Sequence, residues 1–268
     1  MPTRPQDAAV FHALHTDFLI LPNAWDVASA KVMELAGAKA IATTSAGVAW
    51  AHGFADGHHL PFAKLVTTIE EIARVVAVPI SADAEAGYAD DPRQVGENIA
   101  ALIGAGAAGI NIEDGKSPHE LHLRKIEAAR EAAIRAGVNL YINARTDVYL
   151  KQLVPAEQAV AETTRRGRAC KEAGASGLFV PFAVKGEEIK AIAEAVDMPL
   201  NIISWAGVPN AASLKALGAR RLSAGTKIAS AALRAAREAA ADFLADGDSD
   251  ALAARAGASV NYNAMFKG

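Results

Sequence analysis

The hydrophobic residues of this chain fall into two alternating kinds of segment. Short runs of β-branched and other apolar residues are separated by longer, alanine-rich segments in which apolar positions recur every three or four residues. The short runs are typical of buried strands, and the longer segments are typical of amphipathic helices. The predicted strands cover residues 18–22, 40–44, 78–83, 109–113, 140–145, 177–181, 200–204 and 221–225.

Glycine marks the end of several predicted helices, just before the next strand begins. It is favoured there because it adopts the left-handed backbone conformation that commonly ends a helix. A Gly-Ala pair recurs at 37–38, 106–107, 174–175 and 218–219, which indicates a repeated helix-to-strand turn. The glycines at the predicted helix ends are Gly37, Gly106, Gly137, Gly174 and Gly218.

Eight strand–helix units follow one another without interruption, which predicts an α/β fold of the (β/α)8 or TIM-barrel type. A doubly wound open sheet is the alternative. That fold usually has fewer strands and often a glycine-rich phosphate-binding turn, and no such turn follows the first predicted strand. Residues 1–245 are therefore expected to form a (β/α)8 barrel domain.

The pattern changes after the eighth predicted strand. Residues 226–245 predict one long alanine-rich helix, Asp246-Gly247-Asp248 interrupts it, and residues 249–256 predict a second, short helix. This C-terminal segment is longer than one barrel helix requires. We expect residues 246–268 to form a helical tail that belongs to the same domain or packs on a partner subunit.

Composition narrows the classes of function. The chain has 268 residues and a net charge of −3, and it lacks a Lys/Arg-rich block, so nucleic acid and anionic membranes are poor candidate partners. No apolar run is long enough to span a bilayer, and the N-terminus lacks the apolar segment of a secretory signal. Cys170 is the single cysteine, so we expect neither an intramolecular disulfide nor a cysteine-based metal site, and we expect Cys170 to be a packing residue on a helix. We expect a cytoplasmic enzyme, although a small-molecule binding protein would have the same composition.

Acidic residues gather where two predicted strands end. Asp83 ends the third strand and Glu85 follows it, and Glu113 ends the fourth strand and Asp114 follows it. In a barrel of this type the carboxyl ends of the strands form one face, which carries the active site. Neighbouring carboxylates repel one another unless a cation joins them, and hard divalent cations prefer oxygen ligands. The sequence therefore predicts a divalent-metal site, with Arg145 at the end of the fifth strand as a facing cation.

Other polar and aromatic residues lie near the same predicted face. Trp25 follows the first strand and fits a substrate wall as well as rim packing. Asn201, in the seventh strand, is a candidate substrate contact. The histidines His52, His58 and His59 follow the second strand. Three histidines so close together raise the alternative of a metal site, but an exposed loop is favoured because histidine is often exposed.

Three motifs, in this order, carry a family resemblance. They are DAEAGY at 83–88, NIED at 111–114 and NARTD at 143–147. With them the chain resembles the isocitrate lyase/phosphoenolpyruvate mutase superfamily. The resemblance covers nearly the whole chain, from PNAWD at 22–26 to RLSAG at 221–225.

The resemblance implies a metal site that takes Mg²⁺, with Mn²⁺ as the alternative. It implies that Asp83 binds the metal directly. The residues that would hold the metal through water are Asp56, Glu85 and Glu113. Because Mg²⁺ keeps several of its waters, few direct protein ligands are needed.

The resemblance also implies how substrate is held and how subunits assemble. A backbone cradle for the carboxylate of a 2-oxo acid would be formed by Thr44, Ser45 and Ala46, and Arg145 would face the substrate oxygens. The family forms tetramers in which a C-terminal helix is exchanged between neighbours. A homotetramer of this kind would explain the tail at 246–268.

The chain departs from the lyases of this family after the fourth predicted strand. Isocitrate and methylisocitrate lyases carry a Lys-Cys-Gly-His type of loop there, with the cysteine as acid, whereas residues 115–122 of this chain read GKSPHELH. The histidine that phosphonate-acting members carry after strand six is replaced by PFA at 181–183. The candidate proton donors that remain are Tyr88, Lys116, His119 and His122.

These features lead to three hypotheses of function. The first is a Mg²⁺-dependent carbon–carbon lyase or decarboxylase of a small 2-oxo acid or related carboxylate, acting through an enolpyruvate-type intermediate. The second is cleavage or transfer at the P–C bond of phosphonopyruvate. The third is a metal-dependent 2-oxo acid binding protein with little turnover. The candidate catalytic residues are Arg145, Glu113, Tyr88 and His119.

Overall fold

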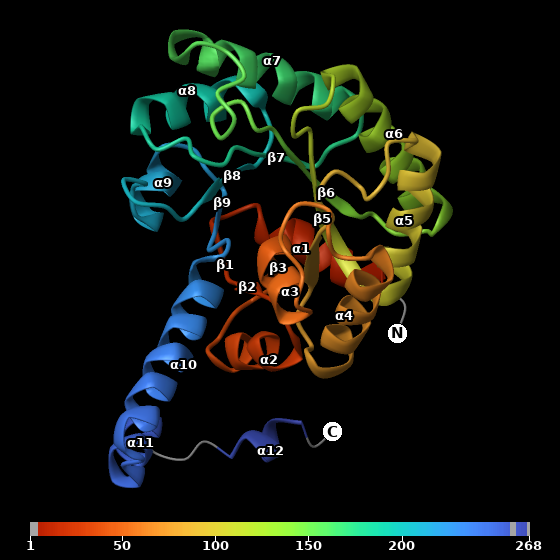
Figure 1. Cartoon of the computed structure of the whole chain (residues 1–268). Coiled ribbons are helices and arrows are strands. Elements are labelled where there is room, and N and C mark those ends of the chain that lie inside the picture. The colour runs from red at the N-terminus through yellow and green to blue at the C-terminus, as the bar shows by residue number, and fades with distance from the viewer. Residues whose placement is uncertain (1–4, 258–260, 267–268) are drawn as a thin grey trace.

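The computed structural model describes residues 5–257 and 261–266, and nine parallel strands within them form a barrel ringed by helices (Figure 1). All eight predicted strands are present, and one short strand is additional. The strands are β1 (Leu19–Leu21), β2 (Asn23–Ala24), β3 (Ile41–Thr43), β4 (Ile80–Asp83), β5 (Ala107–Glu113), β6 (Tyr141–Arg145), β7 (Gly177–Phe179), β8 (Leu200–Ile203) and β9 (Arg221–Ser223).

The additional strand arises because Pro22 divides the first barrel strand into β1 and β2. The sheet order is β1-β9-β8-β7-β6-β5-β4-β3-β2, so β1 and β2 stand at its two ends. β1 pairs with β9 and β2 pairs with β3. Proline has no N–H to donate, but its carbonyl accepts a hydrogen bond from the amide of Ala42 at 3.0 Å. The two halves thus join the ends of the sheet, and the predicted parallel α/β barrel is confirmed.

Helices follow the strands around the outside of the barrel (Figure 1). The five predicted helix-ending glycines all have positive φ, as at Gly106 with φ 116°. No helix in the described part of the chain is long and apolar enough to cross a membrane. The helices are α1 (Pro5–Leu14), α2 (Val27–Leu35), α3 (Ser45–Ala51), α4 (Phe62–Val75), α5 (Pro92–Ala105), α6 (His119–Arg135), the 3₁₀ turn η1 (Ala156–Gln158), α7 (Ala159–Glu172), α8 (Gly186–Val196), α9 (Ala211–Ala216), α10 (Lys227–Asp246), α11 (Ser249–Ala256) and α12 (Tyr262–Met265).

Helix α1 packs against β5 and β6 at the amino-terminal end of the barrel. Its Phe11 is fully buried and lies edge-on to Tyr141, with ring centroids 5.3 Å apart. A side chain at Gly109 would place a Cβ 2.7 Å from the Phe11 ring, so only glycine admits this aromatic plug. With that end filled, the opposite, carboxyl-terminal end of the strands is left to carry the polar groups.

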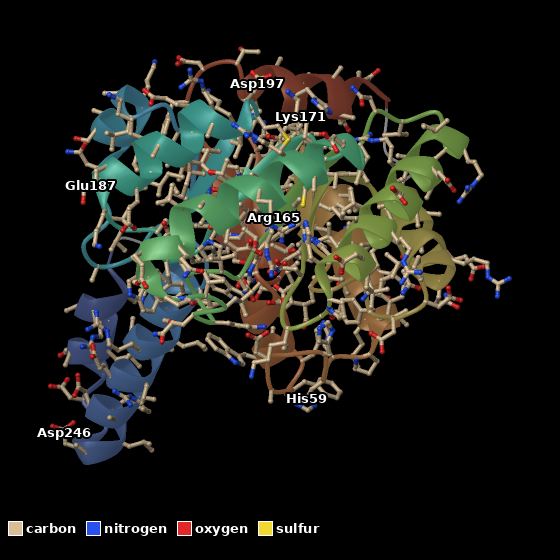
Figure 2. All side chains as sticks on the ribbon, turned by 90° about the horizontal axis from the view of Figure 1, so that it is seen from above. His59, Arg165, Lys171, Glu187, Asp197 and Asp246 are labelled. Atoms are coloured by element: carbon tan, nitrogen blue, oxygen red, sulfur yellow. The ribbon has the colours of Figure 1, made fainter. Side chains whose placement is uncertain are left out.

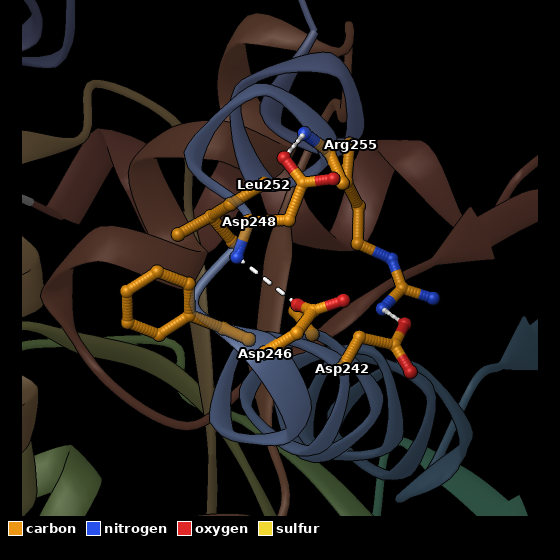
Figure 3. Close-up of a pocket in the computed structure, with 8 residues that line it drawn as sticks. Asp242, Asp246, Asp248, Leu252 and Arg255 are labelled. Atoms are coloured by element: carbon orange, nitrogen blue, oxygen red, sulfur yellow. Dashed lines mark hydrogen bonds and ion pairs between the residues drawn. The ribbon is translucent and has the colours of Figure 1, made fainter.

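The C-terminal helices project away from the barrel (Figure 1). Both predicted helices are confirmed, as α10 and α11, and Gly247 turns the chain between them with φ 72°. Arg255 of α11 pairs with Asp242 of α10 at 2.6 Å, which fixes the corner shown in Figure 3. Only Ala229 of α10 is buried, and Leu244 is 82% exposed. Of the predicted tail 246–268, residues 258–260 and 267–268 lie outside the described residues, as do residues 1–4 at the start of the predicted barrel.

Candidate active site

The ends of β4, β5 and β6 bring the predicted acids and the arginine together. Asp83, Glu113 and Arg145 are the last residues of these strands. Glu113 and Arg145 are Cα partners in neighbouring strands, and the amide of Glu113 donates to the carbonyl of Glu85 at 2.9 Å. Parallel strands of matched register end at the same face, so the side chains meet there. The expectation that these residues gather at one end of the barrel is therefore met.

Asp83 is enclosed, and the only hydrogen bond that it accepts from the described residues comes from a neutral group. The backbone amide of Ser45 donates to its Oδ2 at 3.0 Å, and 9% of the residue is exposed. Burial raises the pKa of the Asp83 carboxyl, the Arg145 guanidinium offsets part of that rise, and the negative charge of Asp56 adds to it. No ion pair neutralises Asp83 within the described residues. This carboxylate is suited to a cation supplied from outside the chain.

Glu85 lies on a turn that bends sharply after β4. Its backbone φ is 46°, and Tyr88 follows with φ 56°, both in the region that side chains rarely adopt. The Tyr88 hydroxyl donates to Glu85 Oε1 at 2.9 Å, and the amide of His58 donates to Oε2 at 2.7 Å. Burial is the main reason that the pKa of Glu85 is raised. Strained backbone of this kind commonly persists at functional sites, where the surroundings hold it.

Two buried side chains donate hydrogen bonds to the backbone of the turn that follows β4. Asn98 Nδ2 donates to the carbonyl of Gly87 at 2.9 Å, and Lys125 Nζ donates to the carbonyl of Ala86 at 3.0 Å. A Cβ at Gly87 would lie 2.7 Å from Val95, so glycine is required there. Helices α5 and α6 thereby fix the conformation in which Glu85 faces the site.

Glu113, Arg145 and Asp147 form a row of alternating charges. Arg145 Nη1 lies 2.6 Å from Glu113 Oε2, and Arg145 Nε lies 2.7 Å from Asp147 Oδ1. Burial raises the pKa of Glu113 to about 7, although Arg145 opposes that rise. Burial alone would lower the pKa of Arg145, but the Glu113 and Asp147 carboxylates raise it above its ordinary value, so the guanidinium stays charged. Arg145 Nη2 donates to none of the described residues, so this side of the guanidinium has room for a further acceptor.

Lys151 belongs to this row, although sequence reasoning did not find it. Its Nζ lies 3.1 Å from Asp147 Oδ2, and its charge contributes to lowering the pKa of Glu113. A Cβ at Gly115 would lie 3.3 Å from this ammonium. The signal in the sequence was the four-residue spacing from Asp147. His58 was weighed as a metal ligand and as part of an exposed loop, with the loop favoured, and its backbone amide donates to Glu85 Oε2. His59 of the same loop lies at the margin of the molecule (Figure 2).

The predicted carboxylate cradle lies at the start of α3, beside the acids. The amide of Thr44 donates to the carbonyl of Ala24 at 3.2 Å, and the amide of Ser45 donates to Asp83. The first helical hydrogen bond runs from the amide of Val48 to the carbonyl of Thr44, so the amides of Ala46 and Gly47 precede the first helical donor and have no acceptor within the helix. Of the predicted cradle, only the amide of Ala46 is left without an acceptor among the described residues, and the amide of Gly47, which we did not predict, is a second.

Glycine is needed at position 47 for steric reasons. A Cβ there would approach Thr44 Cγ2 to 2.8 Å and Trp25 Cβ to 2.9 Å. Trp25 is half-buried and packs against the cradle from the end of β2. Trp25 therefore stands beside Gly47, and its role as substrate wall or rim packing stays a prediction.

The remaining predicted residues lie in different surroundings. Asp56 is on the exposed loop after α3, close enough for its charge to raise the pKa of Asp83. Asn201 lies within β8, where its Oδ1 accepts from the Ser223 hydroxyl at 3.2 Å. His119 begins α6 and is buried, with both ring nitrogens enclosed next to Asp114 rather than at the barrel mouth.

The donor set at the barrel mouth fits a hard divalent cation. Asp83, Glu85 and Glu113 are buried or nearly so, and each has a pKa raised first by burial. Arg145 and Lys151 supply less positive charge than the surrounding carboxylates require. Oxygen donors in this arrangement are those that Mg²⁺ prefers. Asp83, Glu85 and Glu113 could hold the metal, with Asp56 on the loop above them.

Comparison with known proteins agrees with this architecture. The family model for phosphoenolpyruvate phosphomutase matches residues 11–244. An uncharacterized protein of Mycobacterium tuberculosis is 36% identical over 234 residues, which cover 86% of this chain and 87% of that protein. The 2,3-dimethylmalate lyase of Eubacterium barkeri is 29% identical over 184 residues, 66% of this chain and 63% of that enzyme.

Two solved structures show the same fold. A candidate phosphonomutase of Burkholderia cenocepacia is 39% identical, with a TM-score of 0.83 over 87% of this chain and 98% of that one. A 2,3-dimethylmalate lyase, itself a member of the PEP mutase/isocitrate lyase superfamily, is 28% identical, with a TM-score of 0.81 over 90% and 88% of the two chains. This chain therefore belongs to the phosphoenolpyruvate phosphomutase family, within the PEP mutase/isocitrate lyase superfamily.

Proposed function

We propose that this protein is a Mg²⁺-dependent carbon–carbon lyase that acts on a small 2-oxo acid or a related carboxylate, through an enolpyruvate-type intermediate. The observation that carries the proposal is the cluster of Asp83, Glu85 and Glu113 at the barrel mouth, with raised pKa values and Arg145 beside it. Lyases, decarboxylases and mutases that act on carboxylates make up this superfamily. The choice among these reactions is our inference.

Each group at the barrel mouth has a role in this proposal. The amides of Ala46 and Gly47 would bind the substrate carboxylate, and Arg145 Nη2 would orient the oxygens next to it. A bound Mg²⁺ supplies Lewis-acid stabilisation of the negative charge that develops as the bond to C3 breaks. Asp147 keeps Arg145 in place because it is fully buried and bonded to the guanidinium at 2.7 Å.

Decarboxylation agrees best with the connection after β5. Residues 114–118 are all that joins β5 to α6, and they contain no cysteine. Cys170 is buried on α7 and cannot act as the acid of a lyase loop. Departing CO₂ needs no proton, so only the resulting carbanion must be protonated. Lys151, half-buried beside Gly115, is the donor that we propose for that step.

Phosphonopyruvate chemistry remains the second candidate because one specific observation favours it. The Burkholderia cenocepacia structure with 39% identity is a candidate phosphonomutase. Against it, residues 181–183 read PFA, and this sequence places no imidazole after β7. The two candidates share the barrel-mouth metal site and differ in the bond that breaks.

A proton NMR time course would test the proposal. Wild type with Mg²⁺ would be offered oxaloacetate, phosphonopyruvate and branched malates, with Asp83→Asn as the matched control. Appearance of pyruvate or another oxo acid only with wild type would support lyase activity and identify the bond. Exclusive turnover of phosphonopyruvate would favour the second candidate. A Mg²⁺-dependent complex with oxalate but no turnover of any compound would favour a binding protein, our third hypothesis.

We also propose that the active assembly is a homotetramer in which the C-terminal helices are exchanged between subunits. Helix α10 projects from the barrel with Leu233 53% exposed and Leu244 82% exposed. An apolar surface of this kind is expected to be covered in an assembly. Light scattering of the full chain would test the expected mass.

A further inference from the structure

A second group of metal-type donors lies between the end of β5 and helices α6 and α7. Asp114, His119 and His122 each offer one ligand atom, and these atoms lie within 4.8 Å of one another. All three residues are buried. The cluster is separate from the carboxylates of the barrel mouth, because Asp114 points toward Arg166 of α7 rather than toward Asp83.

The imidazole of His119 is a second, independent observation that points to a ligand at this place. Its residue is 6% exposed, and both Nδ1 and Nε2 are enclosed with no hydrogen-bond partner among the described residues. Buried polar groups are nearly always paired, because an unpaired one loses its hydration without compensation. The ring faces the ligand atoms of Asp114 and His122. A cation between these groups would satisfy it.

The imidazole of His122 has the orientation of a metal ligand. Its Nε2 lies 3.2 Å from the carbonyl oxygen of Ile112, so this nitrogen carries the proton that it donates. The lone pair is then on Nδ1, which lies 3.9 Å from the sulfur of Cys170 on α7. Metal-bound histidines commonly donate their other N–H to a carbonyl in this way. The fully buried Cys170 therefore adjoins His122, although its sulfur lies outside the group of three whose ligand atoms are within 4.8 Å of one another.

Asp114 is held in position by groups on its other sides. It accepts hydrogen bonds from the Thr146 hydroxyl at 2.7 Å, the Asp147 amide at 2.9 Å and Arg166 Nη1 at 2.7 Å. A carboxylate offers about four acceptor positions, so one remains. Ligating carboxylates are usually oriented by such bonds.

We propose that Asp114, His119, His122 and Cys170 form a structural transition-metal site that binds Zn²⁺. Two imidazoles, one thiolate and one carboxylate match the borderline-soft character and four-fold coordination of zinc, and they do not suit Mg²⁺. Bonds of about 2.0 to 2.3 Å require Asp114, His119 and His122 to approach more closely than 4.8 Å and the Cys170 sulfur to join them from beside His122. His119 can rotate to close this gap because no hydrogen bond holds its ring. On binding, Cys170 gives its proton to solvent.

The site would have a mechanical consequence for the barrel mouth. It would tie α6 and α7 to Asp114, and Asp114 holds the backbone of Asp147, whose carboxylate binds Arg145. Zinc at this place would stabilise the folded protein, since any ligand that binds only the folded state does so. It would not take part in the reaction.

The test uses the full chain, stripped with a chelator and then dialysed against Zn²⁺, with metal content measured by mass spectrometry. We expect about one tightly held zinc per chain in wild type, in Asp83→Asn and in the surface control His59→Asn. The zinc should be lost in His119→Asn and in Cys170→Ser. Loss of zinc only in Asp83→Asn would place it at the barrel mouth and overturn the proposal, as would no retained zinc in wild type.

A spectroscopic measurement decides the matter if the variants fail to fold. Wild type loaded with Co²⁺ should show the intense visible bands of four-coordinate cobalt and a thiolate-to-metal charge-transfer band in the near ultraviolet. Only Cys170 can supply that thiolate, because it is the single cysteine. A Co²⁺ complex without the charge-transfer band would contradict the assignment.

Discussion

The raised pKa of Glu113 makes metal binding at the barrel mouth dependent on pH. In the metal-free protein this pKa is about 7, chiefly because of burial. Below that pH the carboxyl is largely protonated and cannot serve as an anionic ligand. Binding of Mg²⁺ must then expel a proton, so the affinity falls as the pH falls through 7.

The size of the effect follows from one competing proton. Affinity should weaken by about tenfold for each pH unit below the pKa, so the Kd near pH 6 should be about tenfold weaker than near pH 8. Calorimetric titration of Mg²⁺ in buffers of different ionisation enthalpy would measure both the Kd and the protons released. When Mg²⁺ binds wild type, Glu113 should release nearly one proton near pH 6. Near pH 8 it should release almost none, because the carboxyl is already ionised.

Glu113→Gln provides the matched control, because it keeps the size of the side chain and cannot titrate. We expect weaker binding overall and one proton fewer released near pH 6. The raised pKa values of Asp83 and Glu85 leave a residual pH dependence in this variant. An identical slope in wild type and Glu113→Gln would refute the assignment of the titration to Glu113.

Three further changes test other parts of the structure. Gly47→Ala should weaken oxalate binding by about tenfold or more while the fold is kept, because the new Cβ would lie 2.9 Å from Trp25 Cβ. Unchanged oxalate binding would contradict the assignment of the carboxylate cradle. Asn98→Ala removes the buried hydrogen bond to the carbonyl of Gly87 and should lower the free energy of unfolding by about 1 to 3 kcal/mol. Chemical denaturation would measure this loss, and an unchanged free energy would show that the bond does not stabilise the turn. Deletion of residues 247–268 should reduce the mass of the assembly by light scattering, and an unchanged assembly would argue against exchange of the tail.

The strands and the meeting of the acids could be predicted from sequence for a simple reason. Apolar runs of strand length recur eight times, five of the helices between them end on glycine, and parallel strands of one barrel must end at one face. Asp83, Glu113 and Arg145 were therefore expected to come together, and they are the last residues of β4, β5 and β6. The division of the first strand at Pro22 was not expected, because it depends on pairing with strands on both sides.

The positions of the histidines show where sequence reasoning stopped. His119 and His122 were weighed as proton donors on a loop, whereas α6 begins at His119 and buries both. The same face continues through Ile126 and Ala129, so the helical spacing contained this information. Contacts that depend on backbone conformation, such as the amide of His58 on Glu85, have no such signal in the sequence.

Oxalate binding in the presence and absence of Mg²⁺ tests the central claim most directly. Oxalate resembles the enolate of pyruvate in shape and charge. Calorimetry should show binding to wild type with Mg²⁺, no binding after chelation, and loss of binding in Asp83→Asn. Binding of equal strength without the metal, or in Asp83→Asn, would contradict a metal-dependent site built on the carboxylates at the barrel mouth.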